Sequence, residues 1–419
     1  MRDHRTVEEM KTNSAHPKIC FFGIFGSGNL GNEATFLAIL SSLRRLVPYA
    51  EVACICSGPQ EVAADYNISA FPMKARPLSP VKNRLVRTLR RIFVGIPMEF
   101  YRWYKAILIL KDANMLVMTG TGMLGDFGIL PTNLHYEIVK WSLVAKLCRC
   151  KLLFVSVGVG PIRHRLSRIL VKAALSLADY RSYRDDFSKN YLETMHFNTK
   201  SDFVCPDLAF SLPKTMIPSQ PAKDRAATVV GIGIMTYHSK SNTGDADEGV
   251  YHTYISKLSL LVSWLLNQGY VVRVLIGDAI HDESIRKDLR DSLAGKGIEY
   301  EQAKIIDDPA SSISEVLSQL AATDTVIASR FHNVLLALML GKPVVAISYH
   351  EKVDALMAGL GLSDFCQDIE NIDIDKLIEQ FTTLEQCAGI LMPQIAQKAD
   401  AYRRALEVQY DRIFAGIPS

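Results

Sequence analysis

The sequence predicts an α/β protein with two domains, each built around a mostly parallel sheet. Short apolar runs of β-branched and aromatic residues alternate with stretches that carry apolar residues at helical spacing, which is typical of parallel sheets. The alternation stops once, at a polar stretch that contains Pro213, Pro218 and Pro221. Because a chain of 419 residues has the length of two or three ordinary domains, we place the domain boundary at this stretch.

The first half predicts strands and helices in alternation. The strands are expected at 19–25, 51–56, 113–119, 151–157 and 181–183, and the helices at 36–47, 134–148 and 167–178. Three of the strands end in glycine turns, which are Gly26-Ser27-Gly28-Asn29-Leu30-Gly31-Asn32-Glu33, Gly120-Thr121-Gly122 and Gly158-Val159-Gly160-Pro161. The carboxyl ends of parallel strands share one sheet edge, so these turns predict a cleft that a ligand can approach closely.

The first glycine turn has three interpretations. Gly26, Gly28 and Gly31 satisfy the GxGxxG spacing of dinucleotide-binding loops, but the next strand ends at Cys56-Ser57 without the acid that would hold a ribose. No Gly-Lys-Ser/Thr follows, which excludes a Walker loop. We favour a loop lining a substrate cleft, with a structural turn and a nucleotide-binding loop as the alternatives.

The second half repeats the pattern. Strands are expected at 228–235, 271–276, 325–328 and 343–347, with helices at 251–267, 282–294 and 334–340, and a long helix at 393–413 that Pro393 begins. The predicted organisation is therefore a tail (1–18), an N-terminal Rossmann-like domain (19–212), a linker (213–227), a C-terminal Rossmann-like domain (228–390) and a final helix packing back on the first domain (391–419). Two such domains facing each other across a cleft describe a GT-B-like fold, with the acceptor side in the first domain and the donor side in the second.

Arg330 and His332 are the most informative residues. They stand between the apolar strand 325–328 and the helix that follows, where open α/β sheets bind ligands and where a helix N-terminus favours anions. Arginine adds a permanent bidentate cation, and histidine exchanges protons near neutral pH. Together with Asn333, and with Lys352 after the next strand, they predict a site for an anionic substrate that needs acid–base chemistry.

Arg184 and Asp207 are weaker candidates. Arg184 follows the short strand at 181–183, and it either forms a surface ion pair with Asp185 or faces the cleft. Asp207 either caps a turn or faces the cleft.

Composition limits the classes of function. The net charge of +3 gives no general argument for nucleic acid. The eight cysteines form no CxxC pair, so we expect buried thiols in a reducing cytosol and no metal. The N-terminus has no signal-peptide core and no run is long enough to span a membrane, which predicts a cytoplasmic protein.

Residues 74–111 form a basic segment with ten basic residues and Glu99 as the single acid. Aromatic residues lie in the same stretch, and basic amphipathic helices with aromatics often lie on anionic membranes. A helix packed on its own sheet is the favoured interpretation. Peripheral contact with the inner face of the membrane through 82–105 is the second, and nucleic acid is the least favoured.

These motifs together resemble the polysaccharide pyruvyl transferase family over roughly residues 20–355. The resemblance rests on Gly28-Asn29-Leu30-Gly31-Asn32-Glu33-Ala34, the two later glycine turns, Ser182-Tyr183-Arg184-Asp185 with Ser188, Pro206-Asp207-Leu208-Ala209, Ser329-Arg330-Phe331-His332, and Gly341-Lys342-Pro343 with Lys352. Two positions depart from it: many members have Asp in place of Asn32, and Thr121 interrupts a glycine run.

The resemblance implies phosphoenolpyruvate as donor and no metal or nucleotide cofactor. The product is a pyruvate ketal on two hydroxyls of one sugar, in an exopolysaccharide, capsule or cell-wall precursor that is often lipid-linked. Arg330, Lys352 and Asn333 are then expected to bind the donor, with His332 as general acid. Asp207 and Glu33 are both candidates for the base, and the residues expected along the acceptor cleft are Gly28, Asn29, Asn32, Glu33, Gly120, Gly122, Arg184 and Asp207.

Two alternatives belong to other classes. A GT-B glycosyltransferase with a nucleotide-sugar donor needs a carboxylate near the ribose, and the nearest acids are Asp245, Asp247 and Glu248. A non-catalytic scaffold is disfavoured by the presence of Arg330, His332 and Lys352 together.

Overall fold

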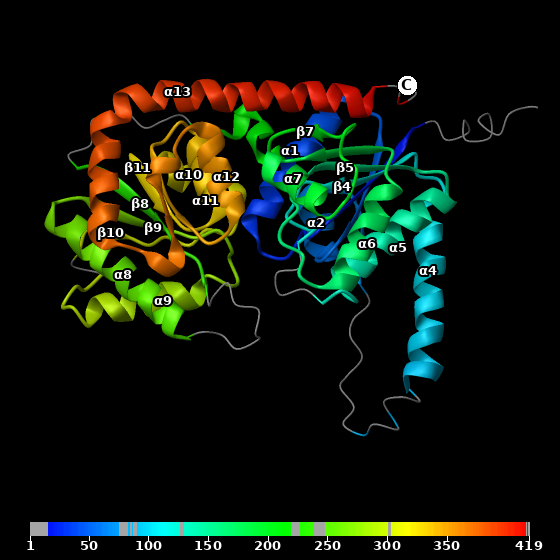
Figure 1. Ribbon diagram of the computed structural model, residues 1–419, viewed down its shortest axis with the longest axis horizontal. Helices are drawn as coiled ribbons and strands as arrows, with labels where there is room; N and C mark the ends of the chain where they lie inside the picture. The colour runs from blue at the N-terminus through cyan, green and yellow to red at the C-terminus, as the bar shows by residue number, and fades with distance from the viewer. Residues whose placement is uncertain are drawn as a thin grey trace, which may run out of the picture.

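The computed structural model describes residues 16–74, 83, 86, 90–125, 130–218, 227–237, 248–300, 303–415 and 417. These residues form two parallel sheets that lie side by side, each flanked by helices (Figure 1). Most of the expected tail and linker and much of the basic segment, Arg87 included, lie outside the described residues, as do Asp245 and Asp247. The predicted α/β class with two mostly parallel sheets is confirmed.

The N-terminal sheet has the strand order β3-β2-β1-β4-β5-β6-β7. Its central strands are almost wholly buried, as expected for apolar runs covered on both faces. The strands are β1 (Lys18–Gly23), β2 (Glu51–Cys56), β3 (Ser69–Pro72), β4 (Met115–Thr119), β5 (Lys151–Val157), β6 (Tyr180–Tyr183) and β7 (Phe203–Val204). The helices are α1 (Leu30–Leu46), α2 (Pro59–Tyr66), α4 (Ile96–Leu110), α5 (Leu134–Leu147), α6 (Arg165–Ser176) and α7 (Asp186–Thr194), with a π-helix η2 (Arg91–Gly95) before α4.

Short 3-10 helices η3 (Leu208–Ser211) and η4 (Lys214–Met216) lead out of this half. The C-terminal sheet has the order β10-β9-β8-β11-β12-β13. Its strands are β8 (Val229–Gly233), β9 (Val271–Leu275), β10 (Ile305–Ile306), β11 (Thr325–Ala328), β12 (Val344–Ser348) and β13 (Cys366–Asp368). Its helices are α8 (Glu248–Asn267), α9 (Glu283–Ala294), α10 (Ile313–Ala321), α11 (Phe331–Met339) and α12 (Glu351–Leu360), with the 3-10 helices η5 (Ser363–Phe365) and η6 (Ile369–Asn371).

The last helix differs from the sequence prediction. α13 spans Ile374–Phe414, so Pro393 lies inside the helix and not at its start. The helix turns sharply near its middle (Figure 1), because a proline removes one backbone hydrogen bond and its ring crowds the preceding turn. The predicted boundary at 390/391 therefore falls within one continuous helix.

α13 joins the two halves. Its first part packs on the C-terminal half, and its last turns reach the N-terminal half, where Tyr410 Oη lies 2.7 Å from Ser211 Oγ. Gln409 Nε2 donates to Ser156 Oγ at 3.0 Å and its Oε1 accepts from Tyr180 Oη at 3.1 Å. One apolar core runs without a break from α1 and η3 into α11 and α13. The two halves are therefore held together by packing as well as by the chain.

Candidate functional site

Both sheets have their topological switch point where the candidate residues lie. β1 pairs with β2 and β4, and β8 pairs with β9 and β11, so connections leave in opposite directions from the centre of each sheet. Ligands bind at the carboxyl ends of the strands at such points. The first glycine turn follows β1, and Ser329-Arg330 follows β11.

The two switch points touch each other. Leu30 N donates to Gly277 O and Ala279 N donates to Gly28 O, both at 3.0 Å, and Asn29 forms an antiparallel bridge with Asp278. Gly28 has a φ of +82°, a left-handed conformation that glycine adopts without strain. Asn29 caps α1 by accepting a hydrogen bond from Asn32 N at 3.2 Å. Gly28 and Asn29 thus dock the first turn onto the C-terminal half.

Gly31 and His332 are in direct contact across the interface. A β-carbon added to Gly31 would lie 1.8 Å from His332 Nδ1, which is far inside any real contact distance. Gly31 has ordinary helical geometry in the first turn of α1, so close approach, and not backbone conformation, requires glycine here. The N-terminus of α1 therefore forms one wall around His332.

His332 is surrounded by cations. Its Nε2 atom is buried, and no hydrogen-bond partner for it is found among the described residues, although the ring keeps some exposed surface. Burial lowers the pKa of His332 well below its usual value, and the charges of Lys352, Arg184 and Arg330 lower it further. Both effects favour the neutral imidazole at neutral pH.

Arg330 is bound by a carboxylate that the sequence prediction missed. Its Nε donates to Asp282 Oδ2 at 2.9 Å and its Nη2 donates to Asp282 Oδ1. Asp282 is fully buried and also accepts from the backbone N–H groups of Gly277 and Asp278 at 3.1 and 2.9 Å. The pair holds Arg330 in place at the start of α11. One signal was available in the sequence, since Asp282 stands at the start of the helix expected at 282–294, shortly after the predicted strand 271–276.

Arg184 and Lys352 meet over the ring of Phe331, one from each half of the molecule. Arg184 Cζ lies 4.8 Å and Lys352 Nζ 5.4 Å from the ring centroid. Arg184 Nη1 also lies 3.6 Å from Asp207 Oδ2. Burial raises the pKa of Asp207, and the Arg184 charge opposes that rise. The interface thus gathers two cations and one buried carboxyl group beside α11.

A cavity of about 510 Å³ lies at this place. Its walls include Arg184, Asp207, Phe331 and Lys352, together with Tyr402 from α13, whereas Arg330 and His332 are not among its lining residues. The volume is in the range of small-molecule sites. Because both halves and α13 line it, the cavity depends on their relative placement.

Of the other predicted residues, Asn333 and Gly122 lie near the cations of the site, whereas Glu33 and Gly120 make their contacts within the N-terminal half. Asn333 is buried at the start of α11, and neither side-chain polar atom has a hydrogen-bond partner among the described residues. Gly122 lies near Arg184, whose Nη2 would be 3.9 Å from an added β-carbon. Glu33 instead turns back into its own half, where it accepts from Gly26 N at 2.7 Å and Tyr66 Oη at 3.1 Å. Gly120 packs against Ser156 and Leu208 in the same half.

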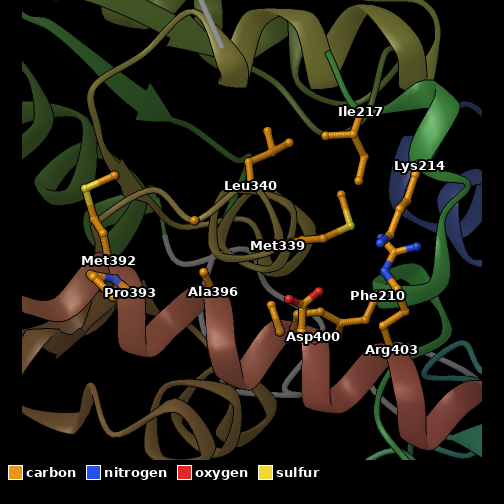
Figure 2. A pocket seen from close by; sticks show the side chains of 12 residues that line it. Phe210, Lys214, Ile217, Met339, Leu340, Met392, Pro393, Ala396, Asp400 and Arg403 are labelled. Atoms are coloured by element: carbon orange, nitrogen blue, oxygen red, sulfur yellow. The ribbon is translucent and has the colours of Figure 1, made fainter. Parts of the chain in front are cut away.

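A second cavity, of about 520 Å³, lies at the bend of α13. Figure 2 shows Lys214 and Arg403 at one end and Met392 and Pro393 at the other. Arg403 Nη1 donates to Leu212 O at 2.8 Å. Phe210 lines both cavities, but Phe331 and Lys352 line only the first of the two.

Within the part of the chain that the structure describes, no three His, Cys, Asp or Glu side chains form a group that could hold a metal ion. Glu248, the described member of the acids considered for a ribose, is exposed at the start of α8.

The two facing switch points and parallel sheets define a protein of the GT-B fold, as predicted, and solved structures share it. A UDP-GlcNAc 2-epimerase from Neisseria meningitidis, bound to UDP-GlcNAc, aligns with a TM-score of 0.54 and 14% identity over 93% of this chain and 99% of that one. MnaA of S. aureus in complex with UDP aligns with a TM-score of 0.58 and 12% identity over 95% of this chain and 96% of that one. A glycosyltransferase from Rickettsia africae aligns with a TM-score of 0.56 and 12% identity over 96% of this chain and 100% of that one. At such identities the likeness establishes the fold alone.

The sequence itself identifies the family. The family model described as polysaccharide pyruvyl transferase matches residues 29–351, and the chain belongs to this family. The resemblance inferred from the motifs is confirmed, and the protein is a transferase. No curated protein matches the sequence significantly.

Proposed function

We propose that this protein transfers the pyruvyl group of phosphoenolpyruvate to two hydroxyls of one sugar, forming a ketal and releasing phosphate. The proposed acceptor is a sugar of an exopolysaccharide, capsule or cell-wall precursor, free or lipid-linked, in the cytoplasm. One observation carries the proposal: the buried Nε2 of His332, which has no hydrogen-bond partner among the described residues, lies among cations from both halves. Such a site suits a small substrate that brings several negative charges and needs a proton.

The donor's two anionic groups have matching partners. Arg184, Lys352 and the backbone N–H groups at the start of α11 offer positive charge and hydrogen bonds, and no side chain caps this helix start among the described residues. Asp282 occupies Nε and Nη2 of Arg330, so we assign Arg330 Nη1 to the donor. Asn333 supplies further polar atoms at the same helix start.

His332 is the proposed general acid. Its neutral form is favoured, but the carboxylate and phosphate of the donor would offset the surrounding cations and raise its pKa. His332 would then give its proton to the methylene carbon of the donor, which becomes a methyl group, while the adjacent carbon becomes electrophilic.

The two hydroxyls react in sequence at that carbon. The first forms a carbon–oxygen bond and loses its proton, and the second displaces phosphate, which leaves with the bridging oxygen. Asp207 and Glu33 were both candidates for the base. Asp207 lies beside Arg184 at the cavity, whereas Glu33 is bound within its own half, so we propose Asp207.

We propose no metal and no cofactor beyond the donor, so activity should persist in EDTA. The competing proposal is a glycosyltransferase with a nucleotide-sugar donor, because two of the proteins with this fold were solved with UDP-GlcNAc or UDP. Phosphoenolpyruvate, and not a UDP-sugar, should raise the melting temperature of the purified protein. A shift with UDP-sugars alone would favour the glycosyltransferase.

Phosphate release in the presence of the acceptor glycan tests the residues. His332→Gln should slow the reaction by about 10²- to 10⁴-fold, because it removes the proposed proton donor. Lys352→Met should reduce that shift, and Lys146→Met, which changes a surface lysine paired with Asp179, should not. Wild-type rates in both His332→Gln and Lys352→Met would refute the assignment.

A further inference from the structure

Helix α4 buries the apolar residues Ala106 and Leu110 but exposes most of its large apolar side chains. Its inward face carries Glu99, Arg102 and Trp103, which bond to α5. Its outward face carries large apolar and aromatic side chains that are exposed to solvent, together with those of the preceding π-helix: Phe93, Val94, Ile96, Met98, Phe100, Tyr101, Tyr104, Ile107 and Leu108. A soluble helix normally buries its apolar face.

The inward face is a connected polar network. Arg102 bonds to both Glu99 and Glu137, and Lys140 Nζ lies 2.6 Å from Glu137 and 3.5 Å from Glu99. Tyr136 Oη donates to Glu99 at 2.7 Å. Glu137 and Lys140 are buried, so their charges need these partners. The network therefore fixes the rotation of α4, and the apolar face stays outward.

The outward face is large and points away from the molecule. Phe93 and Phe100 are 72% and 73% exposed. Figure 1 shows α4 along the outside of the N-terminal half, with its N-terminal end directed away from both sheets. Exposed apolar patches of this kind mark interaction surfaces.

We propose that the outward face of α4 and η2 docks on an anionic lipid membrane. Charge complementarity selects this occupant: the segment 74–111 has ten basic residues and one acid, and Arg102 and Glu99 pair with each other on the inward face, which leaves nine basic residues and no acid in the rest of the segment. The basic residues that the structure describes on the outer side include Lys105, whose Nζ lies 5.4 Å over the Tyr101 ring, while Lys111, just after the helix, lies 3.7 Å from Asp112. Aromatic rings and lysines together suit the boundary between headgroups and acyl chains.

The same charge argues against a second copy of the chain, because two such segments would repel each other. No helix in the described ranges has the length and apolar character to cross a membrane, so the proposed contact lies in the membrane surface. This contact is independent of the proposed chemistry, which needs only the site at α11.

Sedimentation of the full chain with vesicles tests the proposal. The protein should bind vesicles of phosphatidylcholine with phosphatidylglycerol, bind those of phosphatidylcholine alone less, and release at high salt. Phe93→Ser with Phe100→Ser should weaken binding by about tenfold or more, since each ring loses its burial. Ile390→Ser, which changes an equally exposed residue on α13, should bind like the wild type.

Three outcomes would overturn the proposal: no binding to anionic vesicles, unchanged binding in the double variant, or a dimer by light scattering that the double variant dissociates. Thermal unfolding checks that the variant is folded, and Tyr101→Ser with Tyr104→Ser gives a second pair on the same face. Phosphate release with a soluble acceptor should be unchanged in all these variants, which separates failure of the membrane contact from failure of the proposed chemistry.

Discussion

At the scale of single residues, the surroundings of His332 move its pKa away from the ordinary value of a histidine. Burial and the neighbouring cations hold its pKa well below the usual value, and the negative charges of the donor would offset those cations, so we expect donor binding to raise that pKa and take up a proton. Affinity for phosphoenolpyruvate should then fall as the pH rises through the pKa of His332 in the complex. Calorimetry in buffers of different ionisation enthalpy measures this uptake.

The phosphate of the donor titrates in the same range, so His332→Gln is the control. The difference between wild type and variant reports the histidine. Equal proton uptake in both proteins would show that His332 stays neutral and is not the acid.

Lys352 is the charge that contributes most to this depression, after burial. Lys352→Met should therefore raise the pKa of His332 in the empty protein. An NMR titration of the imidazole protons checks the direction, with Lys146→Met as the matched surface change. An unaltered titration in Lys352→Met would mean that the lysine does not act on the ring.

Gly31 permits close contact between helix α1 and the His332 ring, which belong to different halves of the molecule. Gly31→Ala should lower activity strongly, because the added methyl would overlap the imidazole, while the helix itself tolerates alanine well. Gly389→Ala is the control, since nothing lies within 4 Å of an added β-carbon at that helical position. Comparable phosphate release from both variants would contradict a tight contact at Gly31.

The sequence predicts which residues belong to the site better than it predicts their contact and hydrogen-bond partners. The strand-to-helix junction at Arg330 and His332 follows from local pattern, because an apolar run and a helical run meet there. The partners Asp282 and Gly31 come from other parts of the chain, and only the folded arrangement brings them into contact. Glu33 shows the converse, since a residue in the right turn faces away from the site.

At the scale of elements, the buried apolar strands are predictable and the two-residue edge strands are not. β2, β5 and β11 begin and end at or near the expected residues because each is a buried apolar run. β7 and β10 have two residues each, too few to show a period, and only pairing with a neighbour makes them strands.

α13 shows how a local rule can mislead. A proline suits the first turn of a helix, so the sequence predicts a start at Pro393. Packing on both halves instead continues the helix through the proline, and the cavity at the bend lies beside it. Contacts distant in sequence outweigh the local cost there.

Gln409 in α13 links the helix to the N-terminal sheet. Gln409→Ala should lower the free energy of unfolding by about 1–3 kcal/mol, because the fully buried Ser156 hydroxyl loses its partner. Val408→Ala changes an exposed neighbour and should stay within about 0.5 kcal/mol of the wild type. Chemical denaturation measures both, and equal stabilities would remove the proposed link.

At the scale of the whole molecule, the two halves share one apolar core and one long helix. We therefore expect a single unfolding transition for the full chain, with the same midpoint by calorimetry and by circular dichroism. Phosphoenolpyruvate should move that one transition upwards, because the cavity takes residues from both halves. Two separate transitions, only one of them sensitive to the donor, would contradict this expectation.

The contact between Gly31 and His332 has a consequence for how the sequence can change over generations. Any side chain at position 31 would meet the ring at position 332, so a mutation at the first position is tolerated only after the second has become smaller. Since losing the ring would remove the proposed proton donor, selection for activity acts on both positions at once. Two positions in different halves of the molecule are thereby inherited as a pair, and a homologue that has lost one of them should have drifted from this chemistry.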